Sequence, residues 1–329
     1  MAGKAEDQAG LKRKLRRRSI WIVIVALLIL VVVCGLAVSG IFQQPPSAKF
    51  PLTAAIIDQL GADFPDPSFI SYANRTLSND GFNVTYYNQS INVDFFRTLA
   101  SSNYGVIILR AHSAQRIDGS TVDLFTSEPY NSDEYVQEQH GGLLTEAMFY
   151  YKPGEYFALS SLFISSLAGR FPNSIVIAMG CDSLKPGCEQ LAAAFIGKGA
   201  KAYIGWSNMV LPSDTDAETE ILLDMLFNQN KTVQDAVGST NPHLYYGNES
   251  LTNSTQIAVE TQMGFYPASA GTLKVSQLIA QSDKSSTPTV SIVSAGFLTC
   301  LVLNEPRDEQ HKKAALRDER EEKQRDSRP

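Results

Sequence analysis

Short apolar runs alternate with helical patterns through the middle of the chain. Runs of four to six mostly apolar residues, each too short for a helix, predict buried strands at 52–57, 82–87, 104–109, 175–179 and 202–205. Apolar residues at helical spacing predict helices at 69–79, 93–100, 161–169, 191–197, 213–226 and 232–237. This alternation predicts an α/β fold with a mostly parallel sheet and helices on both faces.

Two segments interrupt the alternation. Residues 118–156 contain short β-like pieces at 121–126 and 143–150, separated by a polar loop with His140. We expect an antiparallel insertion there, at the carboxyl edge of the sheet. Residues 241–284 are rich in loop-forming residues, and their pattern predicts no particular element.

The ends of the chain have a different composition from this middle. Residues 19–42 form an apolar run without charged residues that is long enough for a helix spanning a bilayer. Seven basic residues precede this run. This predicts a basic cytoplasmic segment (1–18), a transmembrane helix (19–42) and an extracytoplasmic domain (43–284). A second apolar run, 288–303, is interpreted as a second span, with a buried element of the outer domain as the alternative. A charged tail, 304–329, follows it.

These features predict a protein of the cell membrane that crosses it once, or twice if 288–303 also spans. Six Asn-x-Ser/Thr glycosylation acceptors lie downstream of the first span, which favours an exposed glycoprotein domain. They begin at Asn74, Asn83, Asn88, Asn230, Asn248 and Asn253.

Charge is unevenly distributed along the chain. Residues 43–288 carry 13 Lys and Arg against 24 Asp and Glu, a net charge of −11. An acidic domain argues against nucleic acid as a partner. The basic cluster at the amino terminus adjoins the apolar run and is better interpreted as a topology signal for the membrane.

Two side chains that can carry chemistry follow predicted strands. Cys181 comes directly after the strand at 175–179 and Gly180, and His112 follows the strand at 104–109. Open parallel sheets place ligands at the carboxyl ends of their strands, and adjacent strands lie about 4.8 Å apart. A thiol nucleophile needs a base nearby, so a Cys181–His112 pair in one cleft is the catalytic hypothesis. Considered separately, neither residue indicates catalysis. A lone cysteine such as Cys181 is more often a buried inert thiol, and His112 alone would be a polar residue at the end of a strand.

The four cysteines, Cys34, Cys181, Cys188 and Cys300, suit neither a disulfide framework nor a zinc site. A small-loop disulfide between Cys181 and Cys188 remains an alternative role for both. The sequence contains no phosphate loop, dinucleotide fingerprint or HExxH motif, and we expect no cofactor and no metal.

Several segments together resemble the caspase-like cysteine peptidases (clan CD), in particular the gingipain and CHAT-domain branches. The segments are VIILRAHS, VIAMGCDSL and LAAAFIGKGAKAYIGW, followed by DTDAETEILL and TVQDAV. In that family a histidine follows the third strand, a cysteine follows the fourth, and a helix, a Gly-Ala pair and a strand ending in Trp come next. The resemblance covers residues 52–237 and implies a caspase-like fold.

The resemblance also implies roles for individual residues. Cys181 would be the nucleophile and His112 the general acid and base of a peptidase acting on peptide or protein substrates. Backbone N–H groups of Ser113 and Cys181 would bind the oxyanion, although active members often carry Gly where Ser113 stands. A positive φ at Ser113 would therefore be strained. Trp206 and Asp182 would line the pocket for the substrate residue that precedes the cut.

Two alternatives to a membrane-anchored peptidase remain at this point. One is a catalytically inactive caspase-like surface module that binds a protein or ligand, which the serine at position 113 and the acidic surface favour. The other is an α/β surface protein unrelated to the family, in which the strands before His112 and Cys181 are not neighbours.

Overall fold

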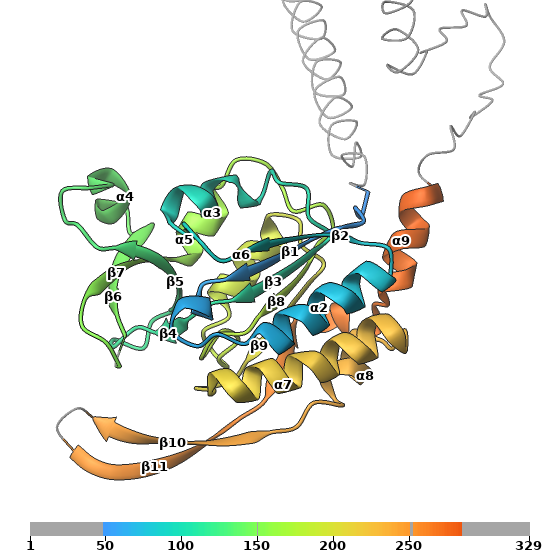
Figure 1. Ribbon diagram of the computed structural model, residues 1–329. Helices are drawn as coiled ribbons and strands as arrows, with labels where there is room; N and C mark the ends of the chain where they lie inside the picture. Colours follow the sequence, from blue (N-terminus) through green and yellow to red (C-terminus); the bar gives the residue numbers. More distant parts are fainter. Residues whose placement is uncertain (1–48, 150, 251–252, 285–329) are drawn as a thin grey trace, which may run out of the picture. The chain divides into compact units, whose positions relative to one another are not determined.

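A six-stranded sheet forms the centre of the molecule in the computed structural model, which describes residues 49–149, 151–250 and 253–284 (Figure 1). The strand order is β12-β9-β8-β3-β1-β2. β1, β2, β3, β8 and β9 pair in parallel, whereas β12 pairs antiparallel with β9. The α/β prediction is confirmed, and the sheet is mixed. Its strands are β1 (Thr53–Asp58), β2 (Asn83–Tyr87), β3 (Val106–Arg110), β8 (Ile175–Ala178), β9 (Ala202–Trp206) and β12 (Met263–Tyr266).

Helices cover both faces of the sheet, as the sequence predicts. Successive residues of one strand point to opposite faces, so Ile56 of β1 packs in one core and Ile57 in the other. The Ile56 side is covered by α2 (Pro67–Asn79), α7 (Pro212–Leu223), α8 (Val233–Val237) and α9 (Val275–Lys284). The Ile57 side is covered by α3 (Val93–Leu99), α5 (Ser161–Ser166) and α6 (Gln190–Gly197).

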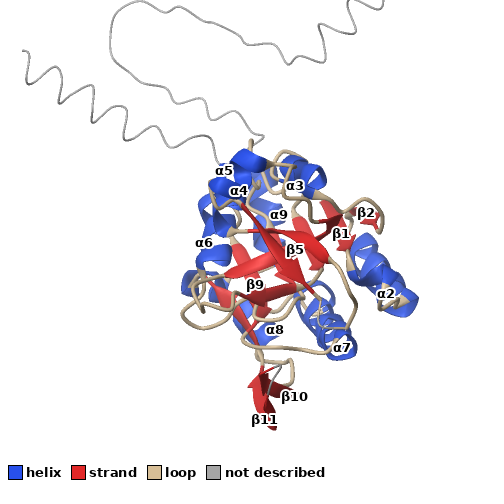
Figure 2. Cartoon of the chain, turned by 90° about the vertical axis from the view of Figure 1, so that its left-hand side faces the viewer, coloured by secondary structure: helices blue, strands red, loops and turns tan. Residues whose placement is uncertain are grey.

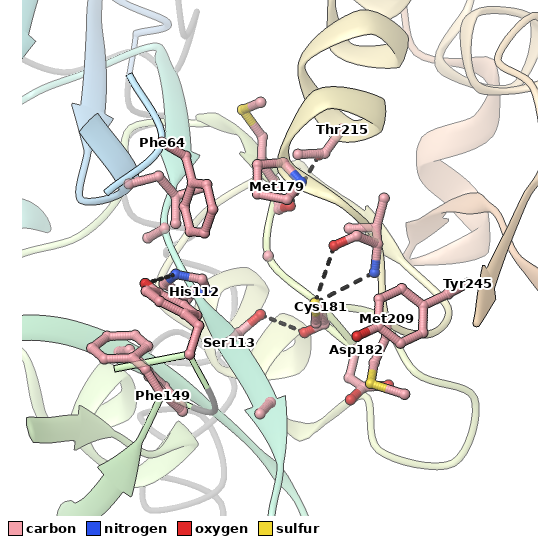
Figure 3. Close-up of a pocket in the computed structure, with 18 of the residues that line it drawn as sticks. Phe64, His112, Ser113, Phe149, Met179, Cys181, Asp182, Met209, Thr215 and Tyr245 are labelled. Carbon is pink, nitrogen blue, oxygen red and sulfur yellow. Dashed lines mark hydrogen bonds between the residues drawn. The ribbon is translucent and has the colours of Figure 1, made fainter. Parts of the chain in front are cut away.

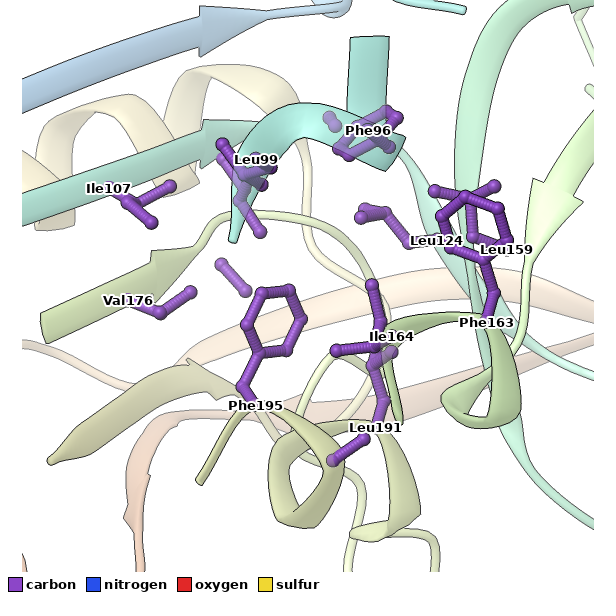
Figure 4. Packing of buried hydrophobic residues seen from close by; sticks show 14 of the residues in the cluster. Phe96, Leu99, Ile107, Leu124, Leu159, Phe163, Ile164, Val176, Leu191 and Phe195 are labelled. Carbon is purple, nitrogen blue, oxygen red and sulfur yellow. The ribbon is translucent and has the colours of Figure 1, made fainter. Parts of the chain in front are cut away.

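A second, antiparallel sheet packs against the Ile57 side. Its order is β4-β5-β7-β6, formed by β4 (Ser113–Gln115), β5 (Val122–Pro129), β6 (Leu144–Met148) and β7 (Glu155–Leu159). Figure 4 shows Leu124 of β5 and Leu159 of β7 packing in the same cluster as Val176 of β8 and Phe195 of α6. Figure 2 views the molecule from the side of this sheet. The predicted antiparallel insertion is confirmed.

Some local predictions differ from the structure. β4 and β7 are strands that the pattern does not predict, and His140 ends a short helix, α4 (Val136–His140), instead of lying in a loop. α7 begins one residue before the helix predicted at 213–226, so Ser213 and Asp214 already lie within it. Leu211 occupies the N-cap position and Pro212, whose ring presets a helical φ, occupies the first turn.

Residues 241–284, which the pattern left unassigned, contain regular structure. β10 (His243–Ser250) and β11 (Asn253–Thr261) form an antiparallel hairpin, and β12 follows it. Three single-turn elements complete the described chain: η1 (Leu60–Ala62), the π-helical η2 (Asp224–Asn228) that continues α7, and η3 (Ala268–Thr272).

The predicted fold class also included a membrane-spanning helix, and this part is corrected. Among the residues that the structure describes, no helix is long and apolar enough to cross a bilayer. The longest α-helix there, α2, has 13 residues, whereas about 20 are needed. The segments predicted as spans, 19–42 and 288–303, lie outside the described residues, as do 1–18 and 304–329.

Candidate functional site

The predicted neighbours β3 and β8 lie side by side and bring His112 and Cys181 to the same edge of the sheet. Leu109 is paired with Ala178 in the parallel register, and His112 and Cys181 each follow three residues later. Both residues line one cavity of about 240 Å³ beyond the carboxyl ends of the strands. The adjacency that the catalytic hypothesis requires is therefore present.

A close backbone approach holds the Cys181 loop against the loop of His112. A side-chain carbon at Gly180 would lie 2.5 Å from Ala111 O and 2.7 Å from Ser113 N, so only glycine fits without a shift. The Ser113 hydroxyl donates to Cys181 O at 2.6 Å, which ties the two loops together. The glycine before the cysteine thus permits the contact that positions the thiol.

The Cys181 sulfur is enclosed, although the residue keeps some solvent exposure. The thiol donates to Val210 O and accepts from Val210 N, both at 3.4 Å. The pKa of Cys181 is raised to about 11, mainly by burial and to a smaller extent by the neighbouring Asp182 carboxylate, while the hydrogen bond from Val210 N–H opposes the shift. At neutral pH the group is accordingly a thiol, not a thiolate.

The His112 ring is packed among aromatic side chains. Its centroid is 4.7 Å from that of Phe149, 6.2 Å from Phe64 and 6.3 Å from Phe125. Burial lowers the pKa of His112 to about 4, although the Asp63 carboxylate partly opposes the shift. The imidazole is therefore neutral at physiological pH.

Hydrogen bonds decide which ring nitrogen of His112 carries the proton. His112 Nε2 lies 2.9 Å from the Tyr151 hydroxyl, which donates to Asp63 Oδ2 at 2.9 Å. Burial alone would raise the pKa of Asp63, but hydrogen bonds from Lys152 and Tyr151 hold that pKa below its ordinary value. An ionised carboxylate only accepts, so the tyrosine proton points to Asp63 and its oxygen accepts from His112. This assigns the Nε2–H tautomer and leaves Nδ1 as the basic nitrogen.

His112 and Cys181 share the cavity without a direct hydrogen bond in the described part of the chain. Figure 3 shows His112 on the side of Phe64 and Phe149, and Cys181 on the side of Met209 and Tyr245. A substrate carbonyl group would have to enter the space between the His112 and Cys181 side chains.

The backbone N–H of Ser113 points toward the Cys181 loop. Phe125 N donates to His112 O at 2.9 Å, so the β4–β5 ladder places the N–H of Ser113 on the side away from β5. Ser113 lies in a strand and is not among the described residues with a positive φ. The strain considered for a serine at this position is thus not found, and the left-handed residue of the site is Asp182, with φ 56°.

The two residues predicted to form the substrate pocket differ in position. Asp182 lines the cavity. Trp206 is fully buried and does not line it. The Trp206 indole N–H donates to Thr215 Oγ1 at 2.8 Å, and Thr215 donates to Met179 O at 3.0 Å. Trp206 therefore supports the cavity wall from behind, because the strand places its side chain in the core and not at the edge.

The alternative of a Cys181–Cys188 disulfide is wrong, since both thiols are free. Cys188 is buried in the core on the Ile57 side, where Gln115 Nε2 lies 3.2 Å from its sulfur. Cys181 packs against the opposite core. The two thiols are therefore separated by the end of the sheet.

Sequence reasoning missed a buried ion cluster beneath the site. The guanidinium of Arg110, the last residue of β3, binds Asp216 through Nε at 2.8 Å and Nη2 at 2.7 Å, and Asp58 through Nη1 at 2.7 Å. Nη2 also donates to Phe64 O at 2.7 Å. The arginine in RAHS was the available signal, because a charged residue within a buried strand requires partners.

Comparison with known proteins adds no assignment: the sequence matches no protein-family model, and no curated protein is similar enough to count as a relative.

Proposed function

We propose that the domain formed by residues 49–284 is a cysteine peptidase of the caspase-like kind, with Cys181 as nucleophile and His112 as general acid and base. The observation that carries the proposal is the position of both residues at one level of two neighbouring parallel strands, lining one cavity. The resemblance of residues 52–237 to caspase-like peptidases supports the same assignment. The acidic charge of this region also favours a polypeptide substrate over nucleic acid.

In the proposed first step, the Cys181 sulfur forms a bond to the carbonyl carbon of the scissile peptide. The thiol proton passes to His112 Nδ1, and the carbonyl π electrons move to oxygen. N–H groups of Ser113 and Cys181 donate to that oxyanion. The Tyr151 oxygen accepts from the Nε2–H of the imidazolium that forms, and the Asp63 carboxylate, which accepts from the Tyr151 hydroxyl, stabilises the positive charge through it.

The intermediate then loses its amine. His112 returns the proton to the leaving nitrogen as the carbon–nitrogen bond breaks, and a thioester with Cys181 remains. Water next attacks the thioester while His112 takes a proton from it. Breakage of the carbon–sulfur bond releases the carboxylic acid and returns the proton to the sulfur, so atoms and charge balance over the cycle.

The resting pair is neutral in this scheme. Burial raises the pKa of Cys181 to about 11 and lowers the pKa of His112 to about 4, so both shifts oppose a preformed thiolate–imidazolium pair. In this scheme proton transfer therefore accompanies attack on a bound substrate. Because Cys181 and His112 do not form a hydrogen bond with each other, the proton can pass between them only when a bound substrate has brought the reacting groups together.

The neutral, separated pair also favours a second candidate function. A caspase-like module that binds a peptide in this cavity without cleaving it needs neither a thiolate nor a contact between Cys181 and His112. Under this alternative, the same cavity recognises a ligand and the thiol is only part of its wall.

Cleavage of a peptide library by the purified full-length chain distinguishes the two functions. We expect cleavage by the native protein and its loss, by more than 1000-fold, in Cys181→Ala and His112→Ala. Cys188→Ala is the matched control, because that thiol is also buried but lies outside the cavity.

An irreversible peptidyl probe for thiols should label Cys181 and leave Cys188 unlabelled, as peptide mapping would show. Peptide binding without cleavage or labelling would support the binding module. Equal cleavage by Cys181→Ala and the native protein would refute the peptidase assignment.

A further inference from the structure

We infer that the site accepts an uncharged, apolar side chain at the substrate residue that precedes the scissile bond. This inference rests on the proposed function and names its substrate class. Its basis is the chemistry of the wall next to Cys181 and the direction in which the substrate has to lie.

The positions of the two reacting groups orient the substrate. His112 has to protonate the leaving amine, so the amine side of the scissile bond faces His112. The acyl residue then extends to the other side of Cys181. Figure 3 shows Met209 and Tyr245 on that side. Because the attacked carbonyl belongs to the acyl residue, its side chain enters the space beside the sulfur.

The wall in that space is mostly apolar. It includes Met209 and Val210 from the connection between β9 and α7, Pro212 and Thr215 of α7, and Tyr245 of β10, and Met179, directly after β8, adjoins it next to Thr215. The Thr215 hydroxyl already bridges Trp206 and Met179 O. Methionines adapt their shape to different apolar groups, so this wall suits leucine, methionine or an aromatic residue.

Charges near this space are already paired. Among the described residues that line the cavity, Asp182 is the one Asp, Glu, Lys or Arg. Its carboxylate accepts from Lys185 Nζ at 2.9 Å and from Gln115 N at 3.4 Å. An arginine or lysine of the substrate would meet a carboxylate whose charge Lys185 already neutralises, and an acidic residue would meet no cation among the described residues that line this wall. Burying an unpaired charge is costly, which disfavours both.

Peptide substrates that differ only at the residue before the cut test this preference. We expect kcat/KM for Leu, Met and Phe to exceed that for Arg, Lys, Asp and Glu by roughly 100-fold or more. Cys181-dependent cleavage that is fastest after Arg, Lys, Asp or Glu would overturn this inference and leave the proposed function standing.

A single substitution should change the specificity in a defined direction. Met209→Asp places an additional carboxylate in the wall, so cleavage after Arg and Lys should rise at least tenfold relative to Leu. Leu211→Asp is the matched control. Leu211 is exposed, does not line the cavity and caps α7, where aspartate is well tolerated. An unchanged ratio in Met209→Asp would contradict the position of the acyl side chain.

A binding measurement covers the case in which the chain cleaves nothing. Full-length Cys181→Ala should bind the Leu, Met and Phe peptides at least tenfold tighter than the Arg, Lys, Asp and Glu peptides, measured by fluorescence anisotropy. Equal binding, or tighter binding of charged peptides, refutes the inference whatever the outcome for catalysis.

Discussion

Tyr151→Phe tests whether the tyrosine sets the protonation of His112. The substitution keeps the ring and removes a hydroxyl that links His112 Nε2 and Asp63 Oδ2 by two contacts of 2.9 Å. Without it, Nε2–H loses its acceptor, and the imidazolium formed during catalysis loses its connection to the carboxylate. The proton is then free to occupy Nδ1, the nitrogen that has to act as base.

The expected loss follows from the energy of one hydrogen bond. A net contribution of about 0.5 to 1.5 kcal/mol for the His112–Tyr151 bond corresponds to a fall in kcat of about 2- to 12-fold. KM should change little, because the Tyr151 hydroxyl faces the histidine and Asp63. The assay is steady-state cleavage of one fluorogenic peptide by the full-length chain.

Tyr156→Phe is the control for this prediction. Tyr156 is also half-buried and packs against Phe149 with ring centroids 4.6 Å apart, but among the described residues its hydroxyl makes no hydrogen bond to His112. Nitrogen chemical shifts of the His112 ring provide a second readout that a purely structural role would not move. An Nδ1–H tautomer in the native protein, or unchanged kcat and shifts in Tyr151→Phe, would refute the reasoning.

Three further predictions concern the surroundings of the site. Gly180→Ala forces the loop away from Ser113 and should lower kcat/KM at least tenfold; native-like kinetics would show that the close approach is dispensable. Arg110→Leu leaves buried carboxylates unpaired and should lower the free energy of unfolding by about 3 to 5 kcal/mol in urea titrations, and adding Asp216→Asn should recover part of it. The pKa of His112 is about 4 in the folded state against 6.5 when solvated. The unfolded chain therefore binds the proton first, and stability should fall by about 3 kcal/mol from pH 6.5 to pH 4. His112→Gln should abolish this component, and an unchanged pH dependence in that variant would contradict the assigned burial.

Much of the architecture was predictable because its signals are local. Buried parallel strands are continuous apolar runs, so all five parallel strands could be located from the sequence. The positions of Cys181 and His112 after two of these runs were visible for the same reason. β7 was not predicted, because it is stabilised by pairing with β5 and β6 and not by a pattern of its own. The β10–β11 hairpin was not predicted, because each of its strands depends on the other.

The sequence by itself determined which residue types stand at the strand ends: a thiol after Gly180 and an imidazole after Arg110. Only the tertiary structure decided their chemical state. Burial among Phe64, Phe149 and Val210 makes both groups neutral, and the Asp63–Tyr151 pair, far from His112 along the chain, selects its tautomer. Desolvation and hydrogen bonding depend on which distant segments pack together, and no local pattern encodes that packing.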